Sequence, residues 1–567
     1  AGWMHTSSGV DNIDEFLEAV TPYAGHWRYR HGGRERPVRE RQIAIAPKNT
    51  LDGHALLYIN PHTSFYFRSE LQMSSDQGLD AYGAVTWGQF FVYQGFNATA
   101  GWMHTSSGVD NIDEFLETVT PYAGHWRYRH GGRERPVRER RIEIAYATPA
   151  GLAQRRFTVY YTEHGPVVRR QGAAWVTVSL MQRPMRALEQ DFLRTKAKDY
   201  AAFRRIMELH TNSSNNTVFA DSAGNIAYFH SNYIPKRDPR FDWTRPVDGS
   251  DPRTDYHGLL SIDETPHVLN PAVGWLYNSN NWPWSAAGPD SPKRADFPAY
   301  VERSTEETPR GLHALELLPA HHHYTMASLT ATAFDSHLPA FETLLPPLLA
   351  AYDRLPAADS RRARLAEPVT VLRGWDHRWG INSLATTLAV FWGSDLYARD
   401  EAVARAAGLS SEDYVERRES PDQLLDALER TVERLRSEFG TWQVPWGEVN
   451  RFQRLDDAPV PHFDDTKPSI AVPFTSSIWG SLASFGAHAY PNTHKWYGTS
   501  GNSFIAVVEF GPRVRARAVT AGGESGDPRS PHFDDEAERY ATGNLRAVYF
   551  YPDELAGHVE RSYHPGE

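Results

Sequence analysis

The residues best suited to metal or nucleophilic chemistry do not complete any common motif. His321-His322-His323 resembles a metal-binding tract, but no carboxylate lies at ligand spacing and a helix is expected from Tyr324-Thr325, which favours a solvated approach to a helix. Cysteine is absent, which excludes disulfides, thiolate metal sites and thiol nucleophiles. The chain has no HExxH, no GxSxG and no glycine-rich phosphate loop. No pair of carboxylates stands out as the catalytic pair of a glycosidase, so that class stays open without support.

The composition is that of a large globular protein. The 567 residues have a net charge of −11, which argues against a nucleic-acid partner because no basic face could neutralise phosphates. No apolar run is long enough to span a membrane, and no signal peptide begins at Ala1, so we expect a processed or partial product. The 17 Trp and 27 Tyr would suit an apolar or carbohydrate ligand, although packing in the core is the commoner reason for such a content.

The stretch from Gln42 to His62 organises the chain and is expected to form two short strands around a turn. Residues 44–46 and 55–59 are apolar, and the segment between them has the Pro, Asn, Asp and Gly of a turn. The second strand leads into Asn60-Pro61-His62.

The remaining pattern alternates between strands and helices. Between 142 and about 310 it is mainly β, with strands expected at 157–161 and 174–179, a hairpin over 217–229 and a short helix over 197–209. After 310 it is helical, and the capping box at Ser420 predicts a helix that Gly440 ends. Strands return at 503–508 and 547–550. No low-complexity linker divides the chain, which favours one intertwined α+β domain.

An internal repeat stands at the start of the chain. Residues 1–43 and 100–142 differ only at Ala19, which corresponds to Thr118, and at Gln42, which corresponds to Arg141. A solenoid repeat would recur more often and diverge at its surface. The second copy continues naturally into the strand pattern after 142, so we expect residues 1–43 to be foreign to the fold and 44–567 to form the main domain.

Several short motifs resemble the penicillin acylase family of N-terminal-nucleophile hydrolases, in the order and approximate spacing of its large β subunit, over roughly residues 44–567. Each motif alone is weak evidence for the resemblance, whereas the ordered set is strong evidence. The chain is most similar to the branch of the aculeacin and acyl-homoserine-lactone acylases. The resemblance implies a four-layer αββα sandwich with helical insertions. The motifs are Asn60-Pro61-His62, Trp102-Met103-His104-Thr105-Ser106, Tyr277-Asn278-Ser279-Asn280-Asn281, Thr308-Pro309-Arg310, Gly522-Gly523-Glu524-Ser525-Gly526 and Pro531-His532-Phe533-Asp534-Asp535.

The resemblance also implies roles for four residues. The Asn280 side-chain amide and the Ser106 backbone N–H match the donors of an oxyanion hole, which stabilises the tetrahedral intermediate of acyl transfer. His62 matches a histidine near the nucleophile, and Arg310 an arginine that supports the asparagine. Read singly, Asn280 could be a turn residue, Arg310 a surface charge at a helix start and His62 a capped core histidine; the ordered set favours the functional interpretation.

A calcium site is implied in the same way. Asp110-Asn111-Ile112-Asp113 resembles the family's calcium loop, in which two carboxylates and the carbonyl of Ile112 are hard oxygen ligands. Pro239 resembles the source of another carbonyl. The family's later aspartate falls at Val301 and its α-subunit ligand is absent, so the alternative is that Asp113 caps a helix beginning at Glu114.

The nucleophile is where this chain departs from the resemblance. A free N-terminal Ser can use its own α-amine as the base, because an α-amine titrates near neutral pH. Counting back from His62 by the family's spacing lands at or near Gln42, and Gln is not a nucleophile. We therefore expect an acylase for N-acyl amines such as β-lactams, lipopeptides or acyl-homoserine lactones that is inactive as written.

Other expectations follow from the resemblance. The alternative function is a catalytically dead member that binds an acylated ligand or a partner subunit. The partners are a small-molecule N-acyl substrate and an α subunit that this chain lacks. No organic cofactor is expected, and calcium is the one ion that the resemblance implies. The expected location is periplasmic or secreted.

Overall fold

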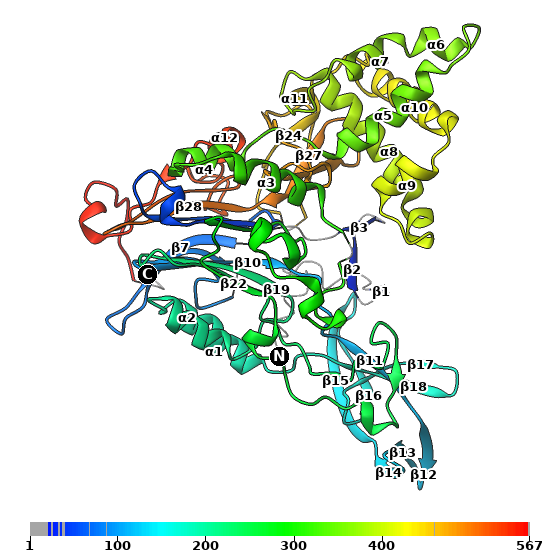
Figure 1. Cartoon of the computed structure of the whole chain (residues 1–567), viewed down its shortest axis with the longest axis vertical. Helices are drawn as coiled ribbons and strands as arrows, with labels where there is room; N and C mark the ends of the chain where they lie inside the picture. Colours follow the sequence, from blue (N-terminus) through cyan, green and yellow to red (C-terminus); the bar gives the residue numbers. More distant parts are fainter. Residues whose placement is uncertain are drawn as a thin grey trace.

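Two large β-sheets pack face to face at the centre of the protein, and helices cover their outer faces (Figure 1). The computed structural model describes residues 40–66, 68–86, 88–304, 306–458 and 460–564, with the backbone alone of 21–23, 26–31 and 34–36. The predicted α+β class and four-layer αββα architecture are confirmed.

The first central sheet has six strands and contains both strands predicted around the first turn. Both of its faces are covered, so its strands read as nearly continuous apolar runs, such as the fully buried Ala55–Asn60. Its order is β23 (Trp275–Asn278), β4 (Arg41–Ile45), β5 (Ala55–Asn60), β28 (Phe504–Phe510), β29 (Val514–Thr520) and β30 (Arg546–Ala547). The last predicted strand, 547–550, is thus shorter and begins one residue earlier.

The second central sheet has seven strands and includes the predicted hairpin over 217–229. Leu57 and Ile59 of the first sheet pack against Met103 and Val218 of the second to form the inter-sheet core. Its order is β22 (His267–Leu269), β20 (Ile226–Phe229), β19 (Asn215–Asp221), β10 (Ala100–Ser106), β9 (Gln94–Asn97), β8 (Asp80–Thr86) and β7 (Arg68–Ser74).

Helices close the two outer layers. Helices α1 (Pro184–Arg194) and α2 (Tyr200–Met207) lie on the seven-stranded sheet, where Phe203 packs against Phe219. Helices α3 (Pro309–Ala320), α4 (Met326–Ala333) and α12 (Ala537–Thr542) lie on the six-stranded sheet, where Leu318 and Leu329 join the core that includes Ile43. The predicted helix over 197–209 corresponds to α2.

A helical insertion with its own apolar core follows these layers. Its longest amphipathic helix is α10, which has the predicted capping box at Ser420 and ends at Gly440, whose φ of 78° is left-handed. The insertion comprises α5 (Ala340–Asp353), α6 (Ser360–Arg364), α7 (Ala366–Arg373), α8 (Leu384–Ala406), α9 (Ser411–Arg418), α10 (Pro421–Phe439) and α11 (Trp446–Val449). A further sheet beside it contains β25 (Ile470–Ala471), β24 (Asn450–Phe452), β27 (Trp496–Asn502), β26 (Phe485–Ala489) and β6 (His62–Ser64).

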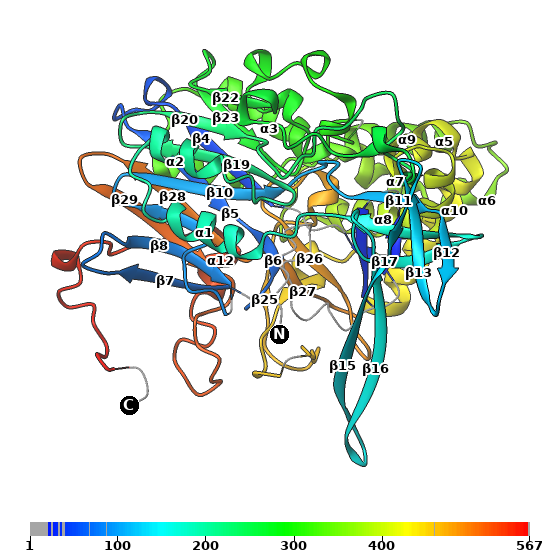
Figure 2. The same ribbon diagram turned by 90° about the horizontal axis from the view of Figure 1, so that it is seen from below.

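An arm of smaller sheets extends from the central layers and ends in one long hairpin (Figure 2). The alternative interpretation, in which Asp113 caps a helix that begins at Glu114, is wrong, because residues 113–117 form a strand. Phe115 and Glu117 are buried in alternation with their neighbours, and residues 113–117 pair with Ser179 to Trp175. The arm contains β17 (Val167–Gln171), β18 (Ala174–Ser179), β11 (Asp113–Glu117) and β21 (Val247–Asp248), then β12 (Val119–Tyr122), β13 (His125–His130) and β14 (Arg133–Pro136), and the hairpin β15 (Arg138–Thr148) and β16 (Gly151–Tyr161).

The two copies of the repeat share one strand pairing. In the first copy β1 (Thr21–Tyr23), β2 (His26–His31) and β3 (Arg34–Arg36) pair as β12, β13 and β14 do in the second. The prediction that 1–43 are foreign to the fold falls mostly outside the described residues and stays a prediction, although Arg41 to Ile43 lie in a central strand. No described helix is both long and apolar enough to cross a bilayer.

Candidate active site

Four of the predicted site residues meet at one end of the two central sheets. His62 begins β6, Ser106 ends β10, Asn280 lies just after β23, and Arg310 is the second residue of α3. All four come from element ends, where a side chain can face the open edge of the sandwich without interrupting a strand. The residue that touches three of them is Glu40, immediately before β4.

Glu40 is 1% exposed and is held at its backbone and its side chain. Its amide N donates to Asn280 Oδ1, and its carbonyl accepts from Arg310 Nη1 at 3.1 Å. Its carboxylate Oε2 accepts the Ser106 backbone N–H at 2.7 Å, while Oε1 lies 4.0 Å from Arg68 Nη2. The predicted oxyanion donor of Ser106 therefore holds a negatively charged oxygen.

Arg310 donates hydrogen bonds to several members of this cluster. It is 1% exposed, so the alternative interpretation of Arg310 as a surface charge at a helix start is wrong. Its Nη2 donates to Ser279 O at 2.7 Å and to Asn280 Oδ1 at 2.8 Å. Its Nη1 lies 3.4 Å from His62 Nδ1, and because a guanidinium can only donate, that ring nitrogen is the acceptor.

Asn280 has a strained backbone that directs its amide. Its φ is 62°, in the left-handed region that non-glycine residues rarely adopt and that is concentrated at functional sites. Its N–H is bound by Asn278 Oδ1 at 2.9 Å, and its side-chain Nδ2 donates to Ser106 O at 3.1 Å. Asn278 Oδ1 also accepts from Thr105 Oγ1 at 2.6 Å, which ties the turn to β10.

Gln42 does not lie in this cluster. Its side chain is fully buried between the sheets, where Nε2 donates to Thr105 Oγ1 and Asn216 O, each at 3.2 Å, and Oε1 accepts Val218 N–H at 3.1 Å. The hairpin register pairs Arg41 with Asn60, so Glu40, the residue before Arg41, lies opposite Pro61, the neighbour of His62. That Gln42 takes the place of the nucleophile stays a prediction; the residue that contacts Ser106, Asn280 and Arg310 lies two positions before it.

The predicted calcium residues form an ion-pair cluster. Arg237 Nε donates to Asp113 Oδ2 at 2.8 Å and its Nη1 lies 3.7 Å from Asp110 Oδ2, while Arg303 donates to Asp110 Oδ1. Burial raises the pKa of Asp113 to about 6, although Arg237 opposes that shift.

The other predicted calcium ligands lie around this cluster. Ile112 is partly buried between the two aspartates in the chain, and Pro239 is exposed. The two carboxylates are already balanced by two guanidinium groups, so a divalent ion is not needed to neutralise them. Calcium binding stays a prediction.

Comparison with known proteins places the chain in a family. The family model described as penicillin amidase matches residues 41–557. The chain belongs to the penicillin amidase family. Its matched segment begins at Arg41, directly after Glu40, so it contains the four predicted site residues His62, Ser106, Asn280 and Arg310.

The relatives are acylases. The acyl-homoserine lactone acylase PvdQ of Pseudomonas fluorescens is 24% identical over 96% of this chain and 74% of its own length. The acyl-homoserine lactone acylase QuiP of the same species is 27% identical, and the penicillin G acylase of Escherichia coli 26% identical, each over 61% of this chain; the matches span 42% and 40% of those two proteins. The thermostable penicillin G acylase of Alcaligenes faecalis has the same fold, with a TM-score of 0.67 at 18% identity over 92% of this chain and 98% of that one.

Proposed function

We propose that this chain has the acyl-amide site of an amidase and that position 40, not Gln42, is the place of its nucleophile. The observation behind this is the 2.7 Å hydrogen bond from Ser106 N–H to the Glu40 carboxylate. Oxyanion donors are expected about 2.7–3.1 Å from the developing charge. The substrate class is an N-acyl amine, such as an acyl-homoserine lactone, a lipopeptide or a β-lactam.

The chemistry depends on what stands at position 40. A Ser there with a free α-amine would have Asn280 Oδ1 as the acceptor for that amine, which is the contact that the Glu40 nitrogen makes. As its hydroxyl oxygen attacks the acyl carbon, the α-amine would take the hydroxyl proton, and the Ser106 N–H would stabilise the oxyanion. The amide C–N bond would then break as the amine leaves with that proton, and water would hydrolyse the acyl ester. Arg310 would orient Asn280 by its hydrogen bond to the same Oδ1.

With Glu at this position the reaction lacks two groups. The nitrogen of Glu40 is a peptide nitrogen, so it cannot accept a proton as an amine does. The side chain is a carboxylate that occupies an oxyanion donor instead of presenting a hydroxyl to the substrate. With Glu40 in place, the proposed site binds an acyl amide weakly and does not hydrolyse it. The chain with this sequence then corresponds to the alternative function, a member of the family that binds an acylated ligand without catalysis. Export to the periplasm also stays a prediction.

The test is to supply the missing nucleophile. A full-length Glu40→Ser variant with a specific protease site directly before residue 40 is assayed, before and after cleavage, on chromogenic amides with acyl chains of different lengths. Only the cleaved variant should hydrolyse them, with a burst of the released amine in proportion to enzyme.

A Glu40→Ala variant with the same protease site is the control, because it frees the same amine without a hydroxyl. Hydrolysis by the unmodified chain, or equal hydrolysis by cleaved Glu40→Ala and Glu40→Ser, would contradict the assignment of position 40.

A further inference from the structure

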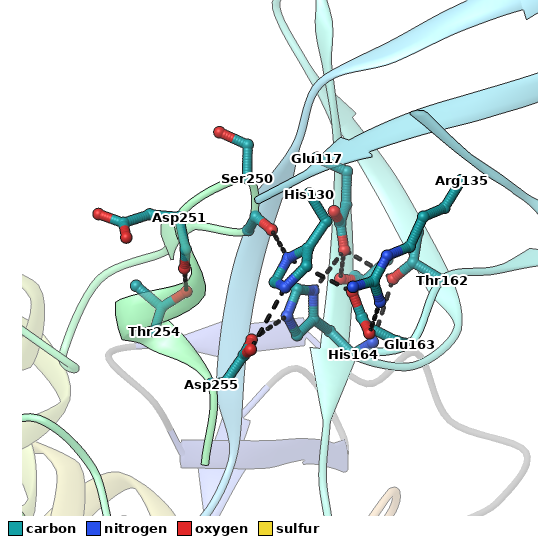
Figure 3. Close-up of polar contacts among 12 residues, drawn as sticks. Glu117, His130, Arg135, Thr162, Glu163, His164, Ser250, Asp251, Thr254 and Asp255 are labelled. Carbon is teal, nitrogen blue, oxygen red and sulfur yellow. Dashed lines mark hydrogen bonds and ion pairs between the residues drawn. The ribbon is translucent and has the colours of Figure 1, made fainter. Parts of the chain in front are cut away.

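A second cluster of chemically able side chains lies at the base of the long β15–β16 hairpin. Figure 3 shows His130 and His164 facing Asp255, with Glu117 beyond His164 and Arg135 against Glu163. The residues come from β11, β13, β14, the turn between β16 and β17, and the segment after β21. The ligand atoms of His130, Glu163 and His164 all lie within 4.8 Å of one another.

The tautomer of His164 is fixed by a buried carboxylate. His164 Nδ1 lies 2.9 Å from Glu117 Oε1, which also accepts from Thr162 Oγ1 at 2.6 Å and Thr177 Oγ1 at 2.8 Å. An ionised carboxylate only accepts, so Nδ1 bears a proton, and in the neutral ring Nε2 is then the lone-pair donor. The ring is held flat against Phe115, with centroids 4.0 Å apart and planes 5° apart.

The tautomer of His130 is fixed by the backbone. Its Nδ1 lies 2.9 Å from Gly249 O, and a carbonyl can only accept, so this nitrogen also bears a proton. The side chain is 3% exposed. A histidine whose Nδ1–H donates to a carbonyl or a carboxylate presents Nε2 in the manner of metal-binding histidines.

Both Nε2 atoms face the same carboxylate. Asp255 Oδ2 lies 3.3 Å from His130 Nε2, and Asp255 Oδ1 lies 3.5 Å from His164 Nε2. Asp255 is held in place because it follows the short turn Pro252–Thr254, whose Thr254 Oγ1 donates to Asp251 O at 2.8 Å. Lone pairs that face a carboxylate repel it unless a cation lies between them.

The distances favour a metal ion over protons as that cation. Charge-assisted N–H···O bonds are about 2.7–2.9 Å long, which is shorter than both separations. Nitrogen and oxygen ligands on one tetrahedral Zn²⁺, at about 2.0–2.2 Å from the ion, are separated by roughly 3.3–3.5 Å.

The net negative charge of the cluster also favours a bound metal ion. With neutral histidines it contains the carboxylates of Glu117, Glu163 and Asp255 and the single cation of Arg135, which is paired with Glu163. The side chain of Glu117 is 0% exposed, and its Oε2 has no hydrogen-bond partner within the described part of the chain. A divalent cation would balance the excess negative charge.

We propose that this cluster binds one Zn²⁺-type divalent ion through His130 Nε2, His164 Nε2 and Asp255. Glu163, whose Oε1 lies 3.3 Å from His130 Nδ1, is not a ligand in this proposal. The ion fastens the arm to the segment after β21, since its ligands come from segments that are distant in the sequence. The site is separate from the proposed calcium residues and from the acylase site, and it does not depend on the nucleophile.

The experiment uses the full chain after treatment with a chelator and desalting. Zn²⁺ is titrated by calorimetry, and Co²⁺ is added separately to record the visible absorption of a tetrahedral site. One equivalent of Zn²⁺ should bind and raise Tm. His164→Gln and Asp255→Asn should each lower the affinity by more than about 10-fold, the lower end of the loss that follows mutation of an outer-shell partner.

His125→Ala is the matched control. His125 lies on the same strand as His130 but is exposed and pairs with Glu139, so its loss should leave Zn²⁺ affinity unchanged. Absence of stoichiometric Zn²⁺ binding to the folded chain would overturn the proposal. So would equal affinity of the His164→Gln and His125→Ala variants, with circular dichroism used to confirm that both are folded.

Discussion

Gln42 is predicted to connect the two central sheets and to take no part in chemistry. It makes three hydrogen bonds, to Thr105 Oγ1, Asn216 O and Val218 N–H, at 3.1–3.2 Å, and it is fully buried. The informative substitution is Gln42→Met, because Met has nearly the volume of Gln but neither accepts nor donates these bonds. The packing of the site is then kept while the polar connection is removed.

The expected loss follows from the number of bonds. A buried hydrogen bond contributes about 0.5–1.5 kcal/mol net, and each partner left unsatisfied adds a desolvation cost. Three bonds therefore predict that Gln42→Met lowers the free energy of unfolding by about 2–4 kcal/mol. Urea denaturation followed by tryptophan fluorescence measures it, and the midpoint should fall without a change in slope.

Two further variants make the result decisive. Gln42→Ala should lose more than Gln42→Met, because it also removes buried volume. Gln77→Met is the surface control, since Gln77 is exposed and its side chain donates to neighbouring Asp76. A loss below about 0.5 kcal/mol for Gln42→Met, equal to that of the control, would refute the role of Gln42 as a connection between the sheets.

Two other predictions concern the surroundings of the active site. Arg310→Met should destabilise the fold by about 3 kcal/mol or more, because the carbonyls of Glu40 and Ser279 and the Oδ1 of Asn280 all lose a charged donor; an unfolding midpoint equal to that of the unmodified chain would contradict this. Asp335 should make stability fall in acid: burial raises its pKa, but hydrogen bonds from His313 and the His337 amide outweigh burial and hold the pKa below its usual value. The stabilisation is thus complete above the unfolded pKa of about 3.9 and is lost as pH falls through the lower, folded pKa, so the difference in unfolding free energy between the unmodified chain and Asp335→Asn should be largest near pH 6 and shrink below pH 4. A difference that stays constant from pH 6 to pH 3 would contradict the assignment.

The parts of the fold that local patterns determine could be predicted from the sequence. Strands such as Ala174–Ser179 and the helix Pro421–Phe439 have uninterrupted periodicity and clear end signals. The strand at Asp113–Glu117 also fits the pattern of a helix start, because an Asp before Glu-Phe-Leu is a capping pattern. Pairing with Ala174–Ser179, far along the chain, decides it.

The site was only partly predictable, for a related reason. His62, Ser106, Asn280 and Arg310 could be placed by their motifs, since each motif is short. The register of a hairpin determines which residue at the start of the first strand lies beside them. A residue two positions further along the strand has its side chain on the same face of the sheet, but it lies outside the site. The arginines that neutralise Asp110 and Asp113 lie far away in the sequence, where spacing gives no signal.

The near-identity of residues 1–43 and 100–142 has a consequence for how the chain folds. The second copy supplies β10 to β14, and β10 is a central strand between β9 and β19. A newly made chain exposes the first copy before the second, and both have the same side chains for pairing with β9 and β19. If the first copy pairs with β9 and β19 before the second copy is made, the chain must release it before the native topology can form. Refolding should show a slow phase that disappears when residues 1–39 are deleted.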